Sequence, residues 1–122
     1  LLTVMVIPSQ RKITINGFEV SLIIPNARDI YKNLDEVLII QFYLNEDNTI
    51  KNMVDKLKSI QPIMKNIWIV SYSYIDMPKH INNYVISDEV NVNGENVFPF
   101  SQIILDVVQY IDKINYSGFK IL

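Results

Sequence analysis

The centre of the sequence carries a strand–helix–strand pattern. Two nearly continuous apolar runs, near residues 37–44 and 67–75, have the length and composition of strands that are buried on both faces. Between them, residues 49–60 place apolar side chains at helical spacing, and Pro62 follows. A helix that connects two strands in this way is nearly always a right-handed crossover between parallel strands. The pattern therefore predicts a parallel βαβ unit.

Two Asn-Gly dipeptides, at 16–17 and 93–94, indicate further strands. Asn-Gly tolerates the positive φ angles of a tight hairpin turn, and alternating apolar residues surround the first of the two. A two-residue turn at 16–17 pairs Ile15 with Phe18 and puts the apolar side chains of both strands on one face. We therefore predict two hairpins in addition to the parallel pair.

Two more helices are indicated by polar residues that can cap them. Asn26 precedes a segment at 27–34, and Ser101 precedes an amphipathic segment at 102–114. With the helix at 49–60, the chain has three predicted helices around a mixed sheet. The sequence thus predicts a single α/β domain over residues 1–122.

The order of elements from Leu22 to Ile114 is also similar to that of the thioredoxin fold. Where that family carries its Cys-x-x-Cys, at the entrance to the helix after the buried strand, this chain reads NEDNT. The resemblance implies a thioredoxin-like α/β fold without redox cysteines, and it implies no activity.

Composition argues against several classes of function. The 11 Lys and Arg residues are interleaved with 13 Asp and Glu residues, and the net charge is −2, so the basic stripe typical of nucleic-acid binders is missing. The absence of cysteine excludes disulfides, thiolate zinc sites and thiol nucleophiles. With 3 glycines, the chain cannot form a G-x-G-x-x-G or P-loop motif. We expect an intracellular, cytoplasmic protein with no cofactor and no membrane segment, and we do not expect nucleic acid as a partner.

The candidate site follows from the parallel strands, because ligands of open α/β sheets bind beyond the carboxyl ends of such strands. Glu46 follows the first strand, while Tyr74, Asp76, Lys79 and His80 lie at or after the end of the second. These side chains are predicted to meet at one rim. Capping of a turn is a simpler role for Asp76, since Asp is common at such positions. No motif supplies a nucleophile with its base, so we assign no catalytic residue and no metal ligand.

The main functional hypothesis is an interaction module that is not an enzyme. Exposed hairpin edges and a rim with tyrosines suit binding to another protein or to a second copy of the chain as a homodimer. The Ile-, Asn-, Lys- and Tyr-rich composition is typical of AT-rich coding DNA, which suggests an accessory protein of a virus, a mobile element or an AT-rich microbe.

Two alternatives stay open. The first is a small-ligand- or metal-binding domain, or an enzyme, with its site at the carboxyl ends of the parallel strands. Its residues would be Glu46, Asp76 and His80. The second is binding of nucleic acid through Arg11, Lys12, Arg28 and Lys32.

Overall fold

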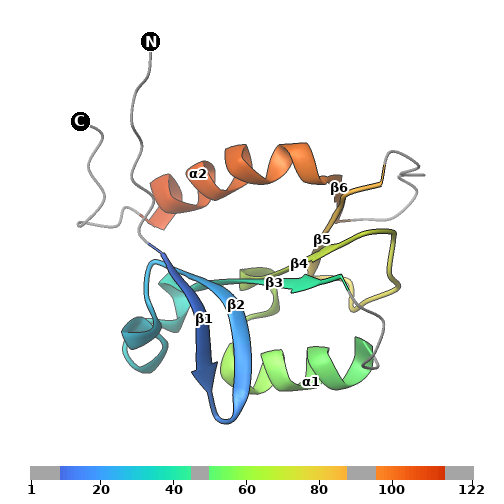
Figure 1. The fold of residues 1–122 in the computed structure, drawn as a ribbon. Coiled ribbons are helices and arrows are strands. Elements are labelled where there is room, and N and C mark those ends of the chain that lie inside the picture. The colour runs from blue at the N-terminus through green and yellow to red at the C-terminus, as the bar shows by residue number, and fades with distance from the viewer. Residues whose placement is uncertain (1–8, 45–49, 88–95, 115–122) are drawn as a thin grey trace.

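The computed structural model describes residues 9–44, 50–87 and 96–114. Six strands form one sheet in the order β1-β2-β3-β4-β5-β6, with one α-helix on each face (Figure 1). The elements are β1 (Gln10–Ile15), β2 (Phe18–Ile24), β3 (Leu38–Tyr43), α1 (Ile50–Ile60), β4 (Ile67–Ser71), β5 (Asn82–Val85), β6 (Val97–Pro99) and α2 (Ile103–Ile114). β1, β2 and β3 are antiparallel, whereas β3, β4, β5 and β6 are parallel. The predicted mixed α/β sheet with a parallel β3–α1–β4 unit is confirmed.

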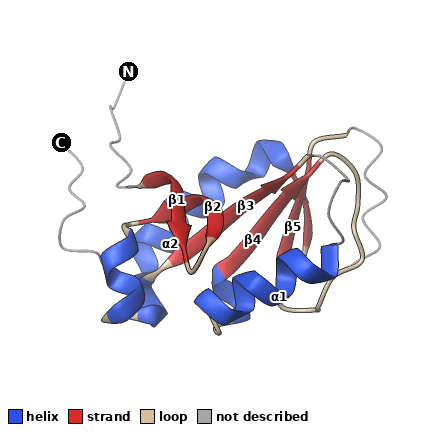
Figure 2. Cartoon of the chain, turned by 60° about the horizontal axis from the view of Figure 1, so that its bottom comes forward, coloured by secondary structure: helices blue, strands red, loops and turns tan. Residues whose placement is uncertain are grey.

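The two central strands are buried on both faces, as their continuous apolar sequences predict. Ile39 of β3 and Ile67 of β4 face α1, where they pack with Leu57 in one core cluster. Leu38 and Trp68, their neighbours in sequence, belong to a second cluster under α2. Because successive side chains of a strand point to opposite faces, each central strand contributes to both cores. The sheet is therefore the middle of three layers, which Figure 2 shows from another side.

The hairpin at 16–17 forms with the predicted register, in which Ile15 pairs with Phe18 and Ile13 with Val20. The positive φ angles of Asn16 (52°) and Gly17 (77°) are those that a type I′ turn requires. The other predicted turn, at 93–94, lies outside the described residues.

Two predicted elements differ from the structure. The segment 27–34 forms two short 3-10 turns, at Ala27–Tyr31 and Leu34–Glu36, so the described residues contain two α-helices where three helices were predicted. The Asn26 cap does form, since its side chain accepts a hydrogen bond from the backbone N–H of Asp29. Ile30 is the buried residue of the first turn, so there is too little apolar surface to hold a longer helix.

The second predicted strand, 67–75, ends at Ser71. The predicted helix at 49–60 is α1 from Ile50 onward, and residue 49 lies outside the described residues. Neither α1 nor α2, nor any other helix among the described residues, is long and apolar enough to cross a bilayer.

Gln61 joins the end of α1 to the segment before β3. Its side chain is fully buried, and its Nε2 donates to the carbonyls of Leu34 (2.9 Å) and Val37 (2.7 Å). Its Oε1 accepts from the backbone N–H of Ile63 at 3.2 Å. One side chain therefore satisfies three backbone groups that have limited access to water.

Gln61→Leu keeps the side-chain volume but removes these three partners. We expect the free energy of unfolding to fall by roughly 2–5 kcal/mol, because buried polar groups without partners are costly. Urea denaturation followed by circular dichroism measures the change. Gln109→Leu, at an exposed position of α2, is the matched control and should change stability by less than about 0.5 kcal/mol. Equal stability of the two variants would contradict this role of Gln61.

Candidate functional site

β2 and β3 pair by their backbones over a short length and then separate. The paired part of β2 is Leu22–Ile24. Beyond it, side chains take over: Gln41 Oε1 accepts from the N–H of Ser21 at 2.9 Å, and Gln41 Nε2 donates to the carbonyl of Glu19 at 3.3 Å. The N–H of Phe42 donates to Ser21 Oγ at 3.1 Å. The two strands are thus held apart at the distance that these side chains span.

The hairpin bends toward α1 at the same level. Lys12 in β1 has a φ of 52°, a value rare for a residue with a side chain. Val20 packs in the core on the α1 side, whereas Leu22, two residues later in the same strand, packs against the core on the α2 side. Residues two apart in a regular strand share a face, so β2 turns over between them. The tip of the hairpin therefore curves toward α1 (Figure 1).

A groove of about 640 Å³ lies in this opening, between the hairpin tip, the end of β3 and α1. We call it the splay groove. Its lining residues are Phe18, Gln41, Phe42, Tyr43, Leu44, Asn52, Met53, Asp55 and Lys56. The Lys56 ammonium lies 5.7 Å from the centre of the Phe18 ring, within cation–π range, which favours this position of the charge beside the groove. The groove thus combines two amides, a carboxylate and a cation.

The other flank of α1 borders a second hollow, of about 370 Å³. Lys51, Asp55 and Lys58 of α1 line it, together with residues 76–78 of the β4–β5 connection. α1 carries three lysines and one aspartate, a net charge of +2. The helix α1 is therefore positively charged, while Asp55 and Asp76 lie among the lining residues of the hollow.

The α2 side has the opposite character. α2 contains Asp106, Asp112 and Lys113, a net charge of −1. Burial, with added repulsion from Glu36 and Asp35, raises the pKa of the Tyr110 hydroxyl above its ordinary value. The charges of the two helices therefore favour an anionic ligand beside α1 over one beside α2.

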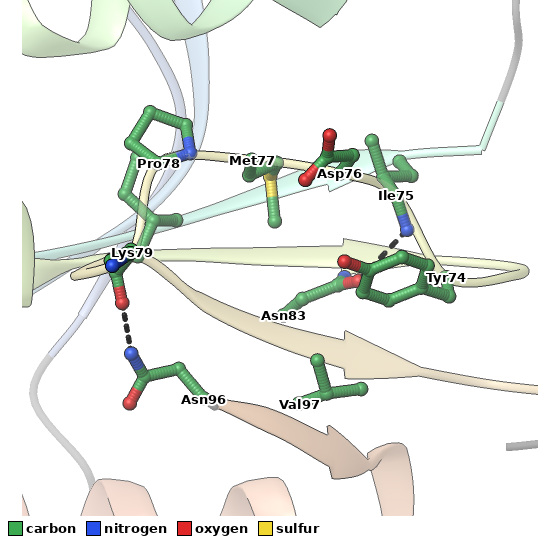
Figure 3. A pocket seen from close by; sticks show the side chains of 10 residues that line it. Tyr74, Ile75, Asp76, Met77, Pro78, Lys79, Asn83, Asn96 and Val97 are labelled. Carbon is green, nitrogen blue, oxygen red and sulfur yellow. Dashed lines mark hydrogen bonds between the residues drawn. The ribbon is translucent and has the colours of Figure 1, made fainter. Parts of the chain in front are cut away.

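The structure brings together part of the site predicted from sequence. Tyr74, Asp76 and Lys79 line a hollow of about 350 Å³ on the connection between β4 and β5. Figure 3 shows Tyr74 at one end of this hollow and Lys79 at the other. His80 is exposed and is not among the lining residues. Glu46 lies outside the described residues, so its predicted approach to Asp76 stays a prediction.

The β4–β5 connection begins after Ser71, before the predicted end of the strand at residue 75, because hydrogen bonds to buried polar side chains fix its path. Ser71 Oγ donates to the carbonyl of Ser73 at 2.7 Å, which closes a tight turn. Asn83 of β5 is buried and accepts from the N–H of Ile75 at 3.2 Å, while its Nδ2 donates to the Ile69 carbonyl at 3.1 Å. Tyr74 is therefore carried on an anchored loop.

No protein-family model matches this sequence, and no curated protein is similar to it in sequence. Solved structures do match. The restriction endonuclease PspGI in complex with substrate DNA has a TM-score of 0.64 at 17% identity, over 88% of this chain and 55% of that one. Metal-depleted Ecl18kI in complex with uncleaved, modified DNA has a TM-score of 0.64 at 14% identity, over 90% of this chain and 41% of that one. The chain shares its fold with these two structures. It spans about half the length of each of these two proteins.

The likeness corrects the main functional hypothesis. A module for protein–protein contacts that is not an enzyme was expected, yet the matching chains are restriction endonucleases, and both are bound to DNA. The expectation against nucleic acid as a partner is wrong on the same evidence. Of the hypotheses drawn from the sequence, the enzyme alternative agrees better with this fold. The likeness gives no support to the thioredoxin-like alternative.

The description of Ecl18kI as metal-depleted raises the question of a metal in this chain. Within residues 9–44, 50–87 and 96–114, no group of three or more His, Cys, Asp or Glu side chains is placed so that it could hold a metal ion. Asp55 is the carboxylate that lines the splay groove. The donors among the described residues therefore do not fit a metal centre.

Sequence reasoning missed the groove residues Gln41, Asn52 and Lys56. A signal for Gln41 was present, since it is a polar residue inside an otherwise apolar strand, LIIQFY. A buried polar side chain needs partners, and here they are backbone groups of β2. Lys56 had no such signal, because exposed lysines are ordinary on the outer face of a helix.

Gln41→Leu should loosen the hairpin where it leaves β3. The Ser21 amide loses its acceptor, so its hydrogen exchange should become about 5- to 30-fold faster, the equivalent of roughly 1–2 kcal/mol. Exchange measured by NMR tests this, with the amide of Ile39, inside the backbone ladder, as the internal control. If the Ser21 amide exchanged at the same rate in Gln41→Leu and in the unmutated chain, after correction for global stability, the bridging role of Gln41 would be contradicted.

Proposed function

We propose that this chain is a DNA-processing domain that has duplex DNA as its substrate and binds it on the α1 side of the sheet. One observation carries the proposal: the fold matches two DNA-bound restriction endonucleases over 88% and 90% of the chain. Both of these structures are complexes with DNA, which favours the same class of substrate for this chain.

The charge distribution supports the α1 side as the surface that meets DNA. The phosphodiester backbone supplies most of the affinity of protein–DNA complexes through contacts with Lys and Arg. Lys56 lies at the splay groove and Lys51 and Lys58 on the other flank of α1, so a duplex along this helix meets three lysines, with Asp55 as the acidic residue of α1 in both linings. The α2 side offers acidic side chains instead.

The splay groove supplies the polar groups for closer contacts. Asn52 and Lys56 are exposed on the flank of α1 that borders it. Phe18 holds Lys56 in place by its ring, so the charge does not have to be ordered when DNA binds. We assign Lys56 and Asn52 to contacts with the phosphate backbone, and we assign Phe18 to positioning Lys56.

Lys56→Gln removes one charge from the groove and keeps a long polar side chain. Affinity for a short mixed-sequence duplex should fall, and the slope of log K against log salt should become less steep by about one, as for the loss of one phosphate contact. Fluorescence anisotropy between about 50 and 200 mM salt measures both quantities.

The matched control is Lys113→Gln, which removes the same charge from the exposed face of α2. It should leave the salt slope unchanged. No binding of duplex at low salt would overturn the proposed function. If the slope of log K against log salt became less steep by the same amount in Lys56→Gln and Lys113→Gln, duplex binding would not depend on the splay groove.

A further inference from the structure

Two tyrosines are exposed where the chain leaves β4. The exposed fractions of Tyr72 and Tyr74 are 64% and 54%, and neither ring has a side-chain hydrogen bond or ring contact with the described residues. Tyr84 contrasts with them, because it is buried against Trp68 and its hydroxyl donates to Asp106. Burial of a tyrosine ring is favourable, so two open rings separated in sequence by one residue leave surface available to a ligand.

Both tyrosines are carried on a backbone that is held in place. The carbonyl of Tyr72 accepts from the N–H of Ser87 at 2.9 Å, and the N–H of Ile75 donates to the buried Asn83. Aromatic rings on an anchored loop need little ordering when a ligand stacks on them. This geometry suits a stacking surface.

The neighbouring charges indicate which ligand fits. Lys79 lies in the same hollow as Tyr74. Residues 76–78 line both this hollow and the second hollow, whose lining holds Lys51 and Lys58 together with Asp55 and Asp76, so Tyr74 lies near the lysines of this flank of α1. Asp76 is the acidic residue that the two linings share. Exposed aromatic rings near lysines are a combination that binds single-stranded nucleic acid, with bases on the rings and phosphates on the lysines.

We propose that the hollow at Tyr74 binds an unpaired stretch of nucleic acid, whose bases stack on Tyr74 and Tyr72 while Lys79 contacts the backbone. This inference rests on the proposed function and names a second substrate element, a single strand beside the duplex. Binding is independent of base sequence, because every base presents a stacking face.

The test compares a single-stranded oligonucleotide that carries 2-aminopurine with a blunt duplex, using Tyr74→Ala and Tyr74→Phe. Tyr74→Ala should weaken binding of the single strand by about fivefold to a hundredfold and abolish the quenching of 2-aminopurine on binding. Tyr74→Phe keeps the ring and should restore both signals. Tyr31→Ala is the matched control, since Tyr31 is 79% exposed in the 3-10 turn that follows β2.

Affinity for the blunt duplex should change by less than about twofold in every tyrosine variant, because the duplex contacts are assigned to α1. Single-strand binding that is equal in Tyr74→Ala and the unmutated chain overturns this inference while leaving duplex binding, and so the proposed function, intact. Equal losses in Tyr74→Ala and Tyr31→Ala also overturn it. If the unmutated chain does not bind the blunt duplex, the proposed function is overturned instead.

Discussion

The separation of β2 from β3 is the constraint on which the site depends. Up to Ile40 the two strands pair through their backbones, and beyond it Gln41 and Ser21 bridge them with side chains. A glutamine can donate and accept at the same time, so it satisfies an N–H and a carbonyl of the departing strand, which an apolar residue could not do. The opening therefore keeps a defined width. The hairpin tip can then reach α1, where Phe18 meets Lys56.

The two faces of the sheet serve different purposes. On the α2 side, Trp68 and Tyr84 lie 5.2 Å apart between ring centres, and the Tyr84 hydroxyl donates to Asp106 at 2.7 Å. Burial and the neighbouring carboxylate raise the pKa of Tyr84 above its ordinary value, so this hydroxyl stays a donor. That side contributes packing and negative charge. The α1 side carries the grooves and the lysines, and DNA binding belongs there under the proposal.

Sequence patterns predicted the fold better than the site, because they report local geometry. The hairpin register at Ile15 and Phe18 and the β3–α1–β4 unit follow from turn chemistry and periodicity. The end of β4 at Ser71 could not be predicted, since it depends on Asn83, which is distant in sequence. The expectation against nucleic acid, which was based on the interleaved charges of the sequence, failed for a related reason. An interleaved sequence conceals the fact that α1 places its lysines, Lys56 among them, on one side of the folded sheet.

An NMR titration with a short duplex tests most directly where DNA binds. We expect large amide shift changes at Asn52 and Lys56 in α1 and at Phe18 in the hairpin tip, with no change at Gln109 and Lys113 on α2. Shift changes that concentrate on α2, or that spread equally over both faces of the sheet, would contradict this expectation.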